Sequence, residues 1–82
     1  MAERTSDEVA QIYNASKDSV TLINSIAAQS TITDDDKATL KRNVDHIEII
    51  KSYKKEDGTT SIWGSEDFST HDAAVTLGKS KY

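Results

Sequence analysis

The chain contains no proline, and its three glycines, Gly58, Gly64 and Gly78, all lie in its last third. Proline and glycine are the residues that interrupt helices most strongly. The first 57 of the 82 residues therefore contain no strong helix breaker. We expect long helices in this region.

A helix-start signal stands near the N-terminus. Thr5 is followed three residues later by Glu8, which is the spacing of a capping box. Apolar and small residues then recur at steps of three and four, as on one face of a helix. They are Val9, Ile12, Tyr13, Ser16, Val20, Ile23 and Ala27. The pattern predicts a helix over residues 6–29.

A second start signal follows shortly after. Thr33 and Asp36 repeat the capping-box spacing, and residues 34–36 are three aspartates, whose charge suits the positive end of a helix dipole. A narrower apolar stripe follows at Leu40, Val44 and Ile47. The pattern predicts a helix over residues 34–54. Because a short link favours antiparallel neighbours, we expect an antiparallel two-helix hairpin.

The segment after the second helix is polar and carries the turn signal Asp57-Gly58. It is predicted to be a loop. The alternative is a β-hairpin that pairs residues 51–55 with residues 59–63, because Asp-Gly suits a tight hairpin turn. An isolated two-stranded ribbon is only marginally stable, which favours the loop.

A short third helix is predicted near the C-terminus, over residues 70–77. Ser65 and Ser69 are candidate N-caps for it, and Gly78 is a typical helix-ending residue.

The predicted fold class is therefore all-α, with one domain. Residues 1–5 are expected to be a flexible N-terminus, residues 6–78 a single helical module and residues 79–82 a frayed tail.

Each long helix carries more apolar surface than one helix contact can bury, because a second stripe lies to one side of the first. One interpretation is that apolar residues after residue 60 fold back and cover this surface. The other is that part of it is an interface with a second copy or another protein, where aromatic residues and arginine are typical anchors. The candidate interface residues are Leu22, Ile26, Arg42, His46, Ile49, Tyr53, Trp63 and Phe68.

No catalytic or metal-binding pattern is present. The chain has no cysteine, and the aspartates at residues 34–36 are interpreted as helix-capping residues rather than as metal ligands. His46 and His71 lack the spacing of a zinc motif. No serine-nucleophile motif occurs, and pockets of about 300 Å³ are hard to build in so short a chain. We expect no enzyme activity, no cofactor and no metal.

The charge and hydropathy exclude two further classes of partner. The net charge is −4, and acidic residues lie among the basic ones, which makes nucleic-acid binding unlikely. The longest apolar runs are far shorter than the roughly 20 residues that span a bilayer, and the N-terminal residues do not form a secretory signal. We expect a protein used inside a cell and away from membranes.

One part of the sequence resembles a known class of proteins. Residues 33–78 contain Arg42-Asn43-Val44-Asp45-His46-Ile47-Glu48, then Trp63-Gly64-Ser65-Glu66-Asp67 and Asp72-Ala73-Ala74-Val75. This pattern is similar to that of short proteins of unassigned role encoded by tailed bacteriophages. It carries no catalytic signature.

The resemblance implies a packing motif in which Trp63 closes over the second helix. Its indole N–H and the acids Glu66 and Asp67 would then meet Arg42 or His46.

The resemblance and the apolar faces together predict a non-enzymatic, self-associating phage structural or assembly protein. Its partners would be further copies of itself and another phage or host protein, in the host cytoplasm or in the virion. Two alternatives stay open, namely a phage factor that binds and modulates a host protein and an oligomer that sequesters a small ligand.

Overall fold

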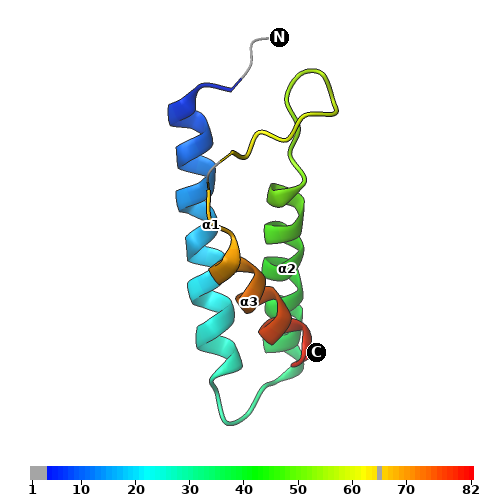
Figure 1. The fold of residues 1–82 in the computed structure, drawn as a ribbon. Coiled ribbons are helices and arrows are strands. Elements are labelled where there is room, and N and C mark those ends of the chain that lie inside the picture. The colour runs from blue at the N-terminus through cyan, green and yellow to red at the C-terminus, as the bar shows by residue number, and fades with distance from the viewer. Residues whose placement is uncertain (1–3, 65) are drawn as a thin grey trace.

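The computed structural model describes residues 4–64 and 66–82, and these residues form three helices. They are α1 (Ser6–Ala27), α2 (Asp34–Lys51) and α3 (Ser69–Lys79). Figure 1 shows α1 and α2 side by side, joined at one end by residues 28–33, with α3 crossing one face of the pair. Each helix packs against the other two. The predicted all-α class is confirmed.

Both long helices begin where the capping boxes predict. Thr5 Oγ1 accepts the backbone N–H of Glu8 at 3.1 Å, and Glu8 Oε1 accepts the backbone N–H of Thr5 at 3.1 Å. Thr33 and Asp36 form the same reciprocal pair, also at 3.1 Å in both directions. The aspartates of residues 34–36 therefore lie in the first turn of α2, as their interpretation as capping residues requires.

Removing the second cap should weaken the fold measurably. In Thr33→Ala the backbone N–H of Asp36 loses its partner, and we expect a loss of about 1 kcal/mol in the free energy of unfolding. Urea unfolding followed by far-UV circular dichroism measures this loss. Thr31→Ala, in the exposed link two residues earlier, is the control and should change stability by less than about 0.5 kcal/mol. Equal losses in the two variants would contradict the capping role.

The helices end earlier than predicted. α1 stops at Ala27 instead of residue 29, and α2 stops at Lys51 instead of residue 54. At the end of α2, Ser52 Oγ donates to the carbonyl of Ile49 at 2.7 Å. The carbonyl of Tyr53, two residues after the last helical residue, accepts the backbone N–H of Ile62 at 3.2 Å, so the chain has already turned away to meet the following segment.

The segment after α2 combines features of the predicted loop and of its β-hairpin alternative. Lys54 and Ser61 form an isolated antiparallel bridge, and no longer ladder occurs among the described residues. Asp57 Oδ1 accepts the backbone N–H groups of Thr59 and Thr60 at 2.9 and 2.8 Å. These bonds, together with one from the Thr60 hydroxyl, lower the pKa of Asp57 to about 2. Because this carboxylate takes both N–H groups, the segment stays a turn.

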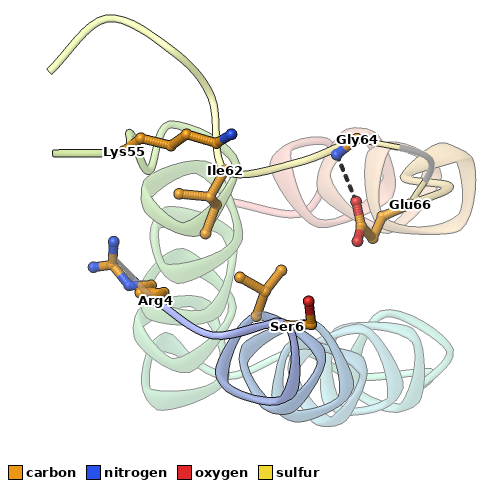
Figure 2. Close-up of a pocket in the computed structure, with 7 residues that line it drawn as sticks. Arg4, Ser6, Lys55, Ile62, Gly64 and Glu66 are labelled. Atoms are coloured by element: carbon orange, nitrogen blue, oxygen red, sulfur yellow. Dashed lines mark hydrogen bonds between the residues drawn. The ribbon is translucent and has the colours of Figure 1, made fainter. Parts of the chain in front are cut away.

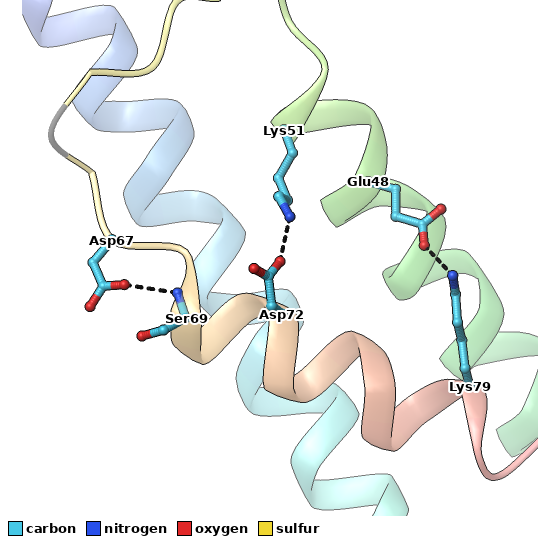
Figure 3. Close-up of polar contacts among 6 residues, drawn as sticks. All are labelled: Glu48, Lys51, Asp67, Ser69, Asp72 and Lys79. Carbon is cyan, nitrogen blue, oxygen red and sulfur yellow. Dashed lines mark hydrogen bonds and ion pairs between the residues drawn. The ribbon is translucent and has the colours of Figure 1, made fainter.

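The start of α3 differs from the prediction. Ser69 is the first helical residue and does not cap the helix, and Phe68 at the N-cap position provides no side-chain hydrogen bond. Instead Asp67 Oδ1 accepts the backbone N–H of Ser69 at 2.8 Å (Figure 3). This bond lowers the pKa of the Asp67 carboxyl group. The other predicted N-cap, Ser65, lies outside the described residues.

α3, in contrast to α1 and α2, ends later in the sequence than predicted. Gly78 is inside the helix, and Lys79 is its last residue rather than the start of a frayed tail. Lys79 Nζ lies 2.6 Å from Glu48 Oε1 of α2, and this contact raises the pKa of Lys79. Gly78 is buried, and side chains of Val44 and Ile23 lie close to its backbone, so it serves packing and not helix termination.

The hydrophobic core lies where the three helices meet. Ile23 of α1 and Leu40, Val44 and Ile47 of α2 are 0% exposed. α3 adds only Ala74 to this buried cluster, with Val75 packed at its edge. The core is therefore mainly a contact between α1 and α2, closed on one side by the small residues of α3.

Candidate functional site

The predicted interface residues fall into three different environments. Ile26 is only 6% exposed and belongs to the hydrophobic core, so it is not available to a partner. Trp63 and Phe68 are half-buried beside α1 and α3. The other candidates, apart from half-buried Tyr53, are exposed positions on the two long helices.

The exposed candidates on α2 lie on the side turned away from α3. Two ion pairs mark the side that faces α3, one between Lys51 and Asp72 and one between Glu48 and Lys79 (Figure 3). An α-helix rotates by about 100° per residue. Ile49 is therefore rotated by about 100° from Glu48 and by about 160° from Lys51.

Arg42 and His46 share this orientation. By the same rotation about the helix axis, Arg42 lies about 120° from Glu48 and about 180° from Lys51. His46 lies about 160° from Glu48 and about 140° from Lys51. Both side chains are exposed. One side of α2 thus carries a large apolar residue, Ile49, beside two basic or titratable ones.

Leu22 lies on the corresponding side of α1. The α3 side of this helix is marked by Ser16, whose hydroxyl contacts His71, and by Tyr13, whose hydroxyl donates to the carbonyl of Asp67 at 2.6 Å. Leu22 is rotated by about 120° from Ser16 and by about 180° from Tyr13. It therefore points away from α3.

We call these residues the outer face. It consists of Leu22, Arg42, His46 and Ile49. Leu22 is 40% exposed and Ile49 is 56% exposed. Among the described residues, no further helix packs on this side of α1 and α2. The outer face is thus a surface that combines exposed apolar groups with an arginine, as protein interfaces commonly do.

The candidates Trp63 and Phe68 pack with Tyr13 and His71 in an aromatic cluster on the opposite side. Trp63 and Phe68 have ring centroids 5.1 Å apart, and Phe68 and His71 have theirs 5.0 Å apart, both edge to face. Tyr13 packs against all three other rings at 5.4 to 6.2 Å. This cluster attaches the segment before α3 to α1.

The indole of Trp63 has a different partner from the predicted one. Its Nε1–H donates to the backbone carbonyl of Ile50 at 2.8 Å and does not meet Arg42 or His46. Trp63 does close over the end of α2, as the packing motif requires. Arg42 instead donates to Thr39 Oγ1 at 3.2 Å, within its own helix.

Ser16 and His71 form a buried polar contact between α1 and α3. Their Oγ and Nε2 atoms are 2.8 Å apart, and the two residues are 0% and 2% exposed. The Ser16 hydroxyl also donates to the carbonyl of Tyr13 at 2.6 Å. A hydroxyl has a single proton, so Nε2 of His71 must carry a proton and donate it to Ser16. The contact therefore fixes the neutral ring in one tautomer and joins two helices.

The sequence pattern did not predict this contact. Ser16 fits the apolar stripe of α1 only as a small residue, and His71 was considered only as a zinc ligand. The sequence did contain one signal for this contact, namely a polar residue at a core position in each of two helices. A buried polar group needs a hydrogen-bond partner, so two such residues can be expected to meet. The pattern does not tell which two helices meet, so the pairing itself required the structure.

Two hollows in the surface are lined by described residues. One of about 350 Å³ lies between the start of α1 and the segment after α2 (Figure 2). It is lined by Arg4, Ser6, Val9, Lys55, Ile62, Gly64 and Glu66. The other, of about 380 Å³, lies along α1 and α3 and is lined by Tyr13, Lys17, Val20, Thr21, Asp67, Thr70 and His71. Hollows of this volume are present, although so short a chain was expected to build them only with difficulty.

Two charged groups of the first hollow, those of Arg4 and Glu66, already have partners within the chain. The Arg4 guanidinium lies over the ring of Tyr53 at 5.0 Å. Glu66 Oε2 accepts the backbone N–H of Gly64 at 2.7 Å (Figure 2). Across residues 4–64 and 66–82, no three acidic, histidine or cysteine side chains gather as a metal ion would require. None of the helices described is both long and apolar enough to cross a membrane.

Comparison of the chain with protein-family models, curated proteins and solved structures found no match. The resemblance to phage proteins therefore stays a prediction from the sequence.

Proposed function

We propose that this chain is a non-enzymatic interaction module in which α1 and α2 form an antiparallel hairpin that self-associates through the outer face. The observation that supports it is the exposure of Leu22 and Ile49 on the same side of the molecule. The apolar residues after residue 60 cover the opposite side, so this segment leaves the outer face open.

A second copy of the chain suits this surface in charge as well as in hydrophobicity. Asp18 is exposed and lies one helical turn before Leu22, on the same side of α1. Arg42 lies on the corresponding side of α2. In a two-fold contact each copy uses the same surface, and we propose the arrangement in which α1 of one copy lies on α2 of the other. This arrangement brings Asp18 of one copy toward Arg42 of the other.

The proposal predicts that the chain is an oligomer and that one charge on the outer face dissociates it. We expect a mass of at least twice 9.0 kDa by size-exclusion chromatography with light scattering. Leu22→Glu places a carboxylate in the contact, and we expect its dissociation constant to rise by at least ~100-fold, because a buried unpaired charge costs several kcal/mol.

The matched control is Leu77→Glu. Leu77 is 39% exposed, almost the same as Leu22, but it lies on α3. This variant should keep the mass of the parent protein, and both variants should keep its helical circular dichroism. A parent mass of 9.0 kDa at every concentration, or equal dissociation by the two variants, would reject self-association through the outer face.

An assembly role in a phage, in the host cytoplasm or in the virion, rests on the sequence resemblance alone. Mass spectrometry of purified phage particles tests it directly. Detection of the chain in a fixed copy number supports a structural role in the virion, and its absence from the particle contradicts that role.

A further inference from the structure

The geometry around His71 points to a pH-sensitive latch: we propose that protonation of this imidazole releases α3 and the residues before it from α1 and α2. The released segment would be residues 66–82. This property concerns the side of the molecule opposite the outer face, so it does not depend on self-association.

The first argument is the hydrogen bonding of the neutral ring. Nε2 of His71 donates to Ser16 Oγ, because the hydroxyl proton of Ser16 is already committed to the carbonyl of Tyr13. Nδ1 is buried and has no hydrogen-bond partner among the described residues. In the neutral ring Nδ1 is only an acceptor. Protonation turns it into a buried donor with no acceptor, and a charge is added at the same place.

The second argument is the set of charges around the ring. Lys17 on α1 and Lys51 on α2 disfavour a positive imidazole, whereas Asp72 on α3 and Asp67 just before it favour one. Both acids already have partners, since Asp72 pairs with Lys51 and Asp67 accepts the backbone N–H of Ser69. Burial is the largest influence, and it lowers the pKa of His71 below its usual 6.5.

The consequence for stability follows from proton linkage. In the docked state His71 binds a proton less readily than in the released state. The docked state is therefore fully stabilised above the pKa of the released ring, near pH 6.5, and loses this stability as the pH falls. At a pH below the pKa of His71 in the docked state, the ratio of released to docked protein is raised. The increase is about tenfold for each unit by which this pKa lies below that of His71 in the released state.

The third argument is that α3 itself contributes little to the hydrophobic core. Its two ion pairs with α2 have side chains between 38 and 56% exposed, and exposed ion pairs contribute little to stability. The buried cluster receives only Ala74 from α3, while α1 and α2 supply its six other residues. Release of α3 therefore leaves most of the contact between α1 and α2 in place.

Amide hydrogen exchange between about pH 7.5 and about pH 5 tests the latch, because histidine titrates in this range while carboxylates stay ionised. After correction for the intrinsic rate, we expect exchange at Ala74 to become at least ~10-fold faster at the lower pH. Exchange at Leu40 should change much less. Trp63 emission should shift to longer wavelength over the same range, because its ring loses the contact with Phe68.

Two variants assign the effect to one residue. His71→Gln retains an N–H donor for Ser16 but does not titrate, and it should lose the pH dependence at Ala74. His46→Gln changes the other, exposed histidine and should behave as the parent does. Persistence of the pH dependence in His71→Gln, or its absence in the parent protein, would overturn the proposal.

An NMR titration of the parent protein covers the case in which His71→Gln does not fold. We expect the ring of His71 to titrate at lower pH than the usual 6.5 of a histidine, together with the change at Trp63. Titration of His71 at or above this usual value, or titration without any change at Trp63, would equally overturn the latch.

Discussion

Leu40→Ala should lower the free energy of unfolding by about 2 to 5 kcal/mol. Leu40 is 0% exposed and lies in the cluster that joins α1 to α2. Truncation removes apolar contact area and leaves a cavity, which neighbours in two rigid helices fill only in part. Urea unfolding followed by circular dichroism measures the loss. Since domains this small have a total stability of only several kcal/mol, the variant should be largely unfolded at 37 °C.

Leu77→Ala is the matched control for this prediction. It makes the same chemical change on α3, at a side chain that is 39% exposed. We expect it to cost no more than about 1 kcal/mol. If Leu40→Ala cost no more than Leu77→Ala, the buried cluster would not be the main source of stability.

Local signals in the sequence were sufficient to predict the two long helices. The capping boxes at Thr5 and Thr33 fix each start within a single turn, because the reciprocal bonds involve only residues three apart. The apolar spacing then identifies Val20, Ile23 and Val44 as core residues, and the structure confirms all three. These features depend on neighbours along the chain, so they need no knowledge of tertiary contacts.

The ends of the helices and the role of Gly78 required the structure. α2 ends three residues early because Tyr53 pairs with Ile62, which is nine residues away. Gly78 resembles a helix-ending residue locally, yet the helix continues through it because two side chains from other helices lie against it. In both cases a contact distant in sequence overrides the local preference.

The candidate surfaces were predicted only in part. The second apolar stripe placed Leu22, Ile26 and Ile49 outside the contact between the two long helices, and the structure leaves Leu22 and Ile49 exposed but buries Ile26. Ile26 is rotated by only about 40° from Leu22, and the boundary between core and surface falls between the two positions. Helical rotation alone does not locate that boundary, because it depends on how closely α2 approaches α1.

Gly78→Leu should push α3 off the other two helices and cost about 1 to 3 kcal/mol. A Cβ atom at this position would lie 2.9 Å from Val44 Cγ2 and 3.2 Å from Ile23 Cγ2, which is too close for either atom to stay in place. Leucine is a better helix former than glycine by somewhat under 1 kcal/mol, so the measured loss is reduced by about that amount. Thermal unfolding and the emission of Trp63 report the loss.

Two further variants distinguish this steric effect from a general effect of leucine on α3. Ala73→Leu adds a side chain at an exposed position of the same helix and should leave stability within about 0.5 kcal/mol of the parent. Val44→Ala removes the methyl group that the new Cβ meets first. The double variant Val44→Ala with Gly78→Leu should therefore lose less than the sum of the two single losses. If the two losses were strictly additive, Val44 would not be the residue that excludes a side chain at residue 78. The close packing of α3 against α2 would then not restrict which residue can stand at this position of α3.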